Sequence, residues 1–233
     1  MEPRADAPTD RPEPVPVPDA PWLDAAADVV TASGPDAESY LQSQLSQEIR
    51  DLAVGGHRWT FVLEPTGKVD ALARLVRTAD DTFELRIDPG YGEVLLDRID
   101  RFKIRVKAET TLSPASAATP DELEHERIVR GWPKMGREIV PGDTIPAVTG
   151  VTPFAVDRRK GCYPGQELVE RMDSRSAAAP RSLRRFTVEA GAAPGDPVVV
   201  DGAEVGELTS VNGAAALGYV KRGAEAGDPI DHG

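Results

Sequence analysis

Short segments in which apolar and polar residues alternate limit the folds open to this chain more than any other feature. In the first half of the sequence they lie at Phe83–Ile87 and Ile104–Lys107. A period of two is typical of strands with one buried face. Trp59–Leu63 and Val69–Val76, on either side of Pro65-Thr66-Gly67, have the pattern of strand, turn and strand. Residues 36–52 and 91–102 instead repeat apolar residues with helical spacing. The order of helix, strands, helix and strand predicts an α+β fold with antiparallel sheets rather than repeated βαβ units.

The chain after Pro180 has a different pattern, in which short apolar segments alternate with glycine-rich turns. We expect strands at Arg185–Glu189, Pro197–Asp201, Ala203–Val211 and Ala214–Val220. The Asp201-Gly202 pair between two apolar runs is typical of a two-residue hairpin turn. Several short strands at this spacing predict a small antiparallel β-barrel. We therefore divide the chain into a body over residues 22–179 and a C-terminal barrel over residues 180–233.

Three further segments mark the organisation of the chain before the barrel. Residues 1–21 contain seven of the 21 prolines and few apolar side chains, which predicts a disordered tail. Residues 113–119 are mostly small and predict a linker. Thr119-Pro120-Asp121-Glu122 has the pattern of a capping box with proline at the first helical position, so a helix should begin there.

Charge narrows the classes of partner. Among 233 residues, 39 acidic and 27 basic side chains give a formal net charge of −12. This balance argues against direct nucleic-acid binding, because phosphate binding needs concentrated lysine and arginine. Basic residues nevertheless gather in residues 97–107 and 158–185. Each cluster is either a solvated surface balanced by acidic neighbours or a local anion site, and the sequence leaves both open.

The distribution of apolar runs and of metal-binding residue types gives two expectations. No apolar run approaches the roughly 18 residues of a membrane-spanning helix, and the N-terminus has no apolar secretion signal. We therefore expect a cytoplasmic protein without direct membrane binding. Cys162 is the only cysteine and the three histidines are scattered, so we expect no metal site.

The segment around Cys162 is the richest in chemistry. Pro164 and Gly165 should end an incoming segment, and a short helix with Val169 on its buried face should follow. Cys162 then lies just before a helix N-terminus and just after three basic residues, both of which favour an anion. This arrangement predicts a functional thiolate. The alternative is a small buried side chain, because cysteine is among the most buried residue types.

These residues also resemble a known family. The segment Lys160–Glu167 is similar to the signature of the YgfZ-type folate-binding proteins, which are relatives of the glycine-cleavage aminomethyltransferase. Other segments resemble the same family in the same order: Tyr40–Ser46, Leu63–Lys68, Arg101–Arg105, Gly206–Ser210 and Leu217–Arg222. The resemblance extends over residues 22–222.

The resemblance implies an α+β body around a central cavity that binds a tetrahydrofolate-type cofactor. It also implies an accessory role in assembling or repairing iron–sulfur proteins, with indirect effects on tRNA modification, and iron–sulfur client proteins or assembly factors as partners. On this basis Cys162 and Lys160 are the expected catalytic residues. The expected cofactor-binding residues are Tyr163, Gly165, Gln166, Glu167, Arg171, Gln42 and Trp22.

The sequence also departs from the family. The stretch between Leu112 and Glu122 is short, and Val129 stands where the aminomethyltransferases place a pterin-binding glutamate. These departures favour an accessory factor over a true transferase. Three alternatives stay open: a one-carbon transferase with Asp70 or Glu64 as its base, a thiol-redox or hydrolytic protein that uses Cys162, and a module that has lost its ligand.

Overall fold

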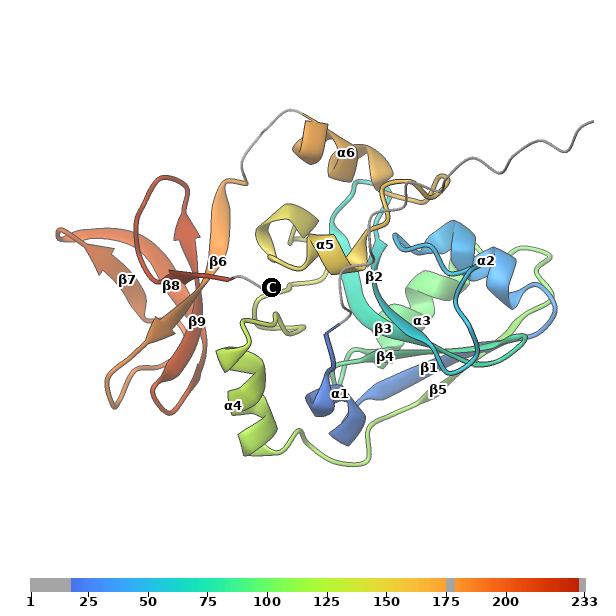
Figure 1. The fold of residues 1–233 in the computed structure, drawn as a ribbon, viewed down its shortest axis with the longest axis horizontal. Helices are drawn as coiled ribbons and strands as arrows, with labels where there is room; N and C mark the ends of the chain where they lie inside the picture. The colour runs from blue at the N-terminus through green and yellow to red at the C-terminus, as the bar shows by residue number, and fades with distance from the viewer. Residues whose placement is uncertain (1–17, 175–178, 231–233) are drawn as a thin grey trace, which may run out of the picture.

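Two five-stranded antiparallel sheets form the framework of the computed structural model, in which residues 18–174 and 179–230 are described (Figure 1). The first sheet has the order β2-β3-β4-β1-β5. Its strands are β1 (Asp28–Ser33), β2 (His57–Leu63), β3 (Val69–Ala79), β4 (Thr82–Ile87) and β5 (Glu109–Ser113). Side chains of its central strands, such as Leu75 and Leu85, are buried in the larger of two apolar clusters among these residues.

Helices cover the first sheet and link it to the second. They are α1 (Pro21–Ala25), α2 (Ala37–Gln44), α3 (Gly92–Asp100), α4 (Asp121–Val129), the 3-10 turn η1 (Pro146–Val148), α5 (Thr152–Ala155) and α6 (Gln166–Ser174). α3 packs against β1, β3 and β5, and α5 packs against β2. The α+β arrangement predicted from the sequence is therefore present.

The predicted helix over residues 36–52 is correct only as far as Gln44. The next residue, Leu45, is extended and forms an isolated bridge with Val62 in β2. The chain therefore leaves the helix to pair with the sheet. Ile49 is fully buried from an irregular segment, so apolar spacing continues where the helix does not.

The strands predicted in the first half of the chain are confirmed except one. Ile104–Lys107 is a loop, and Arg105 has φ 59°, a left-handed conformation that interrupts an extended strand. The fifth strand of the sheet is β5, which pairs with β1. After it, α4 begins at Asp121 close to the predicted position, but its N-cap is Pro120 and no side-chain cap hydrogen bond forms.

The second sheet has the order β10-β6-β9-β8-β7. Its strands are β6 (Arg181–Thr187), β7 (Pro197–Val200), β8 (Ala203–Asn212), β9 (Ala215–Lys221) and β10 (Asp228–Pro229). The predicted hairpin turn is confirmed, because Asp201 and Gly202 have φ 52° and 77°, as a type I′ turn requires. β7 and β10 are edges that do not pair with each other, so no closed barrel is found among the described strands.

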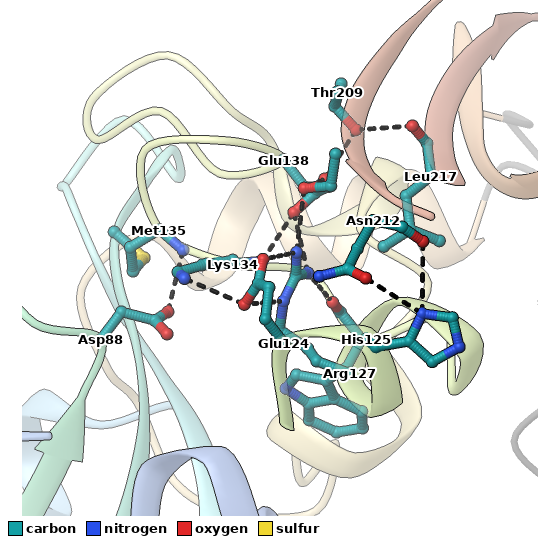
Figure 2. Close-up of polar contacts among 12 residues, drawn as sticks. Asp88, Glu124, His125, Arg127, Lys134, Met135, Glu138, Thr209, Asn212 and Leu217 are labelled. Atoms are coloured by element: carbon teal, nitrogen blue, oxygen red, sulfur yellow. Dashed lines mark hydrogen bonds and ion pairs between the residues drawn. The ribbon is translucent and has the colours of Figure 1, made fainter. Parts of the chain in front are cut away.

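A buried ion pair joins the two parts of the chain (Figure 2). α4 packs against β8 and β9, and its Arg127 lies 3.2 Å from Glu138. Glu138 also accepts hydrogen bonds of 2.6 Å from both Thr209 and Ser210 in β8. Arg127 in turn donates to Glu124 and Ser210. Because the side chains of Arg127 and Glu138 are 1% and 0% exposed, this network fixes the second sheet against the body.

The N-terminal tail predicted over residues 1–21 falls largely on residues 1–17, which lie outside the described residues. Its last residues already belong to the body. Ala20 is fully buried, and the carbonyl of Pro18 accepts a hydrogen bond from the indole of Trp59.

Candidate functional site

Cys162 lies in the loop between α5 and α6, and its side chain is exposed. The helix predicted after it is present as α6, and Val169 is buried as expected. The residues around Cys162 behave differently, because Lys160, Tyr163 and Gly165 are all buried. Burial raises the pKa of Tyr163 to about 12. The thiol is therefore presented at the surface by a loop in which Lys160, Tyr163 and Gly165 are buried.

The first anchor is a contact between two glycines. Gly165 has φ 82°, and a Cβ on it would lie 2.5 Å from the carbonyl oxygen of Glu64 and 2.9 Å from the Cα of Gly67. A Cβ on Gly67 would lie 2.3 Å from Leu168 in α6. The loop before α6 therefore packs backbone to backbone on the turn between β2 and β3, as Figure 1 shows. This contact joins two segments that carry the family resemblance.

The second anchor is Lys160, which is buried and donates hydrogen bonds to the backbone carbonyls of Gln42 (2.6 Å) and Leu45. These carbonyls lie at the C-terminus of α2, where the last turn lacks intrahelical donors and the helix dipole favours a cation. Burial lowers the pKa of Lys160 to about 8. Its ammonium also lies 5.2 Å from the ring centroid of Tyr163.

The side chain of Gln42 holds the irregular segment that follows α2. Its Oε1 accepts a hydrogen bond from the Ile49 amide, and its Nε2 donates to Glu48, both at 3.0 Å. The hydrogen bond from Arg50 is the main reason that the pKa of Glu48 falls to about 2. Gln42 therefore has a structural role in the arrangement seen here.

The remaining residues predicted on the Cys162 segment lie on the first turns of α6. Gln166 accepts a hydrogen bond from the Tyr163 amide at 3.3 Å and donates to Glu170. Glu167 and Arg171 are exposed. A ligand that met these two side chains would therefore lie on the outer surface of α6.

A buried carboxylate and guanidinium lie close to the same turn. The Arg98 side chain, 1% exposed, donates two hydrogen bonds to the carbonyl of Leu63 and one to Gln44. Its Nε lies 3.4 Å from Asp70 Oδ2, a buried oxygen without a hydrogen-bond partner among the described residues. Burial, reinforced by the charge of Glu64, raises the pKa of Asp70, while Arg98 and Arg101 oppose that change.

The sequence placed Arg98 in the basic cluster over residues 97–107 and Gln44 outside the apolar face of its helix, so the burial of both side chains was not predicted. Both occupy inward-facing helix positions: Arg98 is three residues after Leu95 on α3, and Gln44 is four residues after Tyr40 on α2. A polar residue within an apolar stripe was the available signal. The Arg101–Arg105 resemblance begins just beyond Arg98 but does not include it.

Trp22 lies elsewhere, in an aromatic cluster of the core. Its ring centroid is 6.5 Å from that of Trp132, which in turn lies 4.5 Å from Trp59. Trp22 is 2% exposed, and the Arg130 guanidinium lies 5.8 Å from its ring centroid. The structure gives Trp22 a packing role, and its role in cofactor binding stays a prediction.

Surface hollows, metal-binding clusters and membrane-spanning helices each bear on what the site can do. Cys162 lines neither of two surface hollows in the described part of the chain. In residues 18–174 and 179–230 no cluster of three histidine, cysteine, aspartate or glutamate side chains is placed to hold a metal ion. No helix within those ranges has the length and apolar character needed to cross a bilayer.

Comparisons with known proteins agree with this picture at the level of the fold. The chain superposes on the glycine cleavage system aminomethyltransferase T from Bartonella henselae with a TM-score of 0.68 and 15% identity, over 84% of this chain and 76% of that one. It is 25% identical to an aminomethyltransferase of Rippkaea orientalis over 212 residues, 87% of this chain and 53% of that protein.

A shorter match is to a mitochondrial protein of Neurospora crassa, named an iron–sulfur cluster assembly factor IBA57 homolog. It is 33% identical over 106 residues, 43% of this chain and 24% of that protein. No protein-family model matches the sequence. The chain spans about half the length of the aminomethyltransferases it matches. It therefore has the aminomethyltransferase fold, and its relatives are aminomethyltransferases and IBA57-like proteins.

Proposed function

We propose that this chain is a YgfZ-type protein that binds a tetrahydrofolate-type cofactor and assists the assembly or repair of iron–sulfur proteins. The observation that carries the proposal is the convergence of three segments. The loop Lys160–Glu167 is fastened to the end of α2 by Lys160 and to the β2–β3 turn by Gly165, while Cys162 stays exposed. An anchored loop with one free thiol suits a factor that meets a client protein at its surface.

The residues near the β2–β3 turn fit a reduced folate. Its pterin ring carries N–H donors, and Asp70 Oδ2 is a buried acceptor without a hydrogen-bond partner among the described residues. The glutamate tail carries carboxylates, and Arg159 and Arg171 are exposed cations on the Cys162 side. When bound, the folate supplies a carrier for one-carbon units. Asp70 then orients the ring, Arg159 and Arg171 hold the tail, and Cys162 faces the client.

The client class follows from the relatives. The Neurospora crassa protein is named an iron–sulfur cluster assembly factor homolog, and the match to it covers 43% of this chain. We extend that role to this chain as a proposal, together with a cytoplasmic location and an indirect effect on tRNA modification. Because the thiol is single, we assign it to contact with a client rather than to a complete cluster ligand set.

Isothermal titration calorimetry with tetrahydrofolate under anaerobic, reducing conditions tests the proposal. We expect binding in the micromolar range and a loss of about tenfold in affinity for Asp70→Asn, because a charge-assisted hydrogen bond is weakened. Asp97→Asn is the matched control, since Asp97 is exposed on α3. Absence of heat at high micromolar folate, with protein shown to be folded, would contradict folate binding.

The same carboxylate favours one alternative, a one-carbon transferase with Asp70 as its base. Burial and a neighbouring carboxylate raise the pKa of Asp70, which is how proteins tune a carboxyl group for proton transfer near neutral pH. Formation of methylene-tetrahydrofolate from an aminomethyl donor, lost in Asp70→Asn, would establish this activity. Folate binding without that product would leave the accessory role.

A further inference from the structure

The loop Phe102–Lys107, between α3 and β5, exposes apolar and basic side chains together. Phe102 is 41% exposed and Ile104 is 77% exposed. Arg105 and Lys107 are also exposed, and their side chains make no ion pair within the described part of the chain. By contrast, Lys103 pairs with Asp100 at 2.7 Å. These two cations lie beside the exposed Ile104 and the partly exposed Phe102, whose ring centroid is 5.0 Å from the Arg98 guanidinium. Such a cationic and apolar surface stands out on a protein of net charge −12.

The loop leads into an open sheet edge. β5 is the last strand of the first sheet and pairs only with β1 among the described strands. Figure 1 shows β5 at the sheet margin, with the connection from α3 at the end of the molecule away from β6–β9. An unpaired edge presents a row of backbone N–H and C=O groups that a further strand can satisfy.

An apolar hollow lies at the far end of β5. Leu112, Pro114 and Ala115 contribute to its lining, together with Asp28. Asp28 is already satisfied, because its carboxylate accepts hydrogen bonds of 2.8–2.9 Å from the amides of Gly90, Gly92 and Ala115. The hollow therefore offers mainly apolar surface to a side chain of a partner.

We propose that the loop Phe102–Lys107, the outer edge of β5 and this hollow form one docking surface for an extended, acidic segment of a partner protein. Carboxylates of the partner meet Arg105 and Lys107, its backbone pairs with β5, and an apolar side chain enters the hollow. β5 has five residues, which span about 16 Å. The proposal does not depend on folate binding or on Cys162.

The strand edge favours a peptide over an anionic membrane as the occupant. A lipid surface would satisfy the cations and the apolar side chains of the loop, but it has no backbone to pair with β5. Acidic groups of the chain itself limit the attraction, because Glu109 at the start of β5 and Glu93 in the hollow are both exposed. We therefore expect the carboxylates of the partner segment to lie toward Arg105 and Lys107, away from Glu93.

Fluorescence polarisation with a labelled synthetic peptide of about ten residues, alternating glutamate with valine, tests the proposal on the full chain. A lysine-for-glutamate peptide tests the role of charge, and a backbone N-methylated peptide of the same sequence tests strand pairing. The variant Arg105→Glu/Lys107→Glu is compared with Arg137→Glu/Arg222→Glu, which makes the same charge change at other exposed positions. Circular dichroism checks that each variant folds.

We expect micromolar binding of the acidic peptide, weakened about tenfold by Arg105→Glu/Lys107→Glu and by N-methylation, and nearly unchanged in the control variant. Equal losses of peptide affinity in the two variants would show that the affinity depends only on the overall charge of the protein and would overturn the proposal. Absence of binding at high micromolar peptide would overturn it too. Co-sedimentation with phosphatidylserine vesicles that depends on Ile104, without peptide binding, would replace the peptide with a membrane.

Discussion

Two buried cations of this protein, Arg127 and Lys160, have opposite surroundings. Arg127 lies between two carboxylates, Glu124 and Glu138, and these partners raise its pKa although burial works against them. Lys160 is held by neutral backbone carbonyls, and burial lowers its pKa to about 8. Arg127 is therefore a permanent charge that joins two sheets. The Lys160 ammonium, two residues from the exposed thiol, loses its proton just above neutral pH.

Removal of the permanent charge should have the largest effect. Arg127→Met leaves Glu138 buried without its counter-charge, so we expect a loss of about 3–5 kcal/mol in the free energy of unfolding. Urea unfolding followed by fluorescence and circular dichroism measures it. Arg130→Met is the control, because the pair of Arg130 with Glu126 is at the surface and should cost less than about 1 kcal/mol.

The double variant Arg127→Met/Glu138→Gln sharpens this test. Removing the second charge should recover part of the lost stability, because the buried carboxylate is no longer uncompensated. Similar losses in Arg127→Met and Arg130→Met would show that the junction does not depend on the buried pair.

Lys160 should give a smaller effect that depends on pH. Its folded pKa is below the unfolded value, so the unfolded state binds more protons between pH 8 and about 10.5, and the stability of the native protein rises with pH there. Lys160→Met lacks this rise. We expect the unfolding free energy of the native protein, relative to that of Lys160→Met, to rise by about 1–2 kcal/mol from about pH 7 to about pH 9.5.

The comparison uses urea unfolding at several pH values, with Lys68→Met as the control, because the Lys68 side chain is 40% exposed and pairs with the exposed Asp143. Stability curves of native protein and Lys160→Met that run parallel with pH would show that Lys160 is as well solvated as Lys68. The contrast with Arg127 would then disappear.

The glycine contact should give an effect similar in size to that of Lys160. Gly165→Ala puts a Cβ 2.5 Å from the carbonyl of Glu64 at a residue with positive φ, so we expect a loss of about 1–3 kcal/mol. Gly161→Ala is the matched control in the same loop, since a Cβ there meets nothing within 4 Å. Thermal unfolding of both variants measures the difference. A near-neutral Gly165→Ala would mean that the loop is not fastened to the β2–β3 turn.

Local patterns in the sequence predicted the regular parts of this fold and less of the site. Alternation identified β4, which buries one face. β2 and β3 were recognised as apolar segments on either side of a turn, and both are buried on both faces over most of their length. Helical spacing wrongly predicted that the helix continues beyond Gln44, where Leu45 pairs with β2. The spacing of apolar residues shows which side chains are buried but not which backbone groups are hydrogen-bonded. The role of Lys160 at the end of α2 depends on a contact between residues 118 positions apart, which no local pattern contains.

Cys162 should give the smallest change in stability and decides what the anchored loop is for. Its side chain is exposed, so Cys162→Ala should change the unfolding free energy by less than about 0.5 kcal/mol. If the thiol acts on a client, the same variant should fail to restore iron–sulfur enzyme activity in cells that lack this protein, while Gly161→Ala restores it. A variant that folds normally and still restores activity would leave Lys160 and Gly165 supporting a loop whose sulfur has no role. The proposed function would then have to rest on Asp70 and its neighbours alone, which we propose to contact the folate.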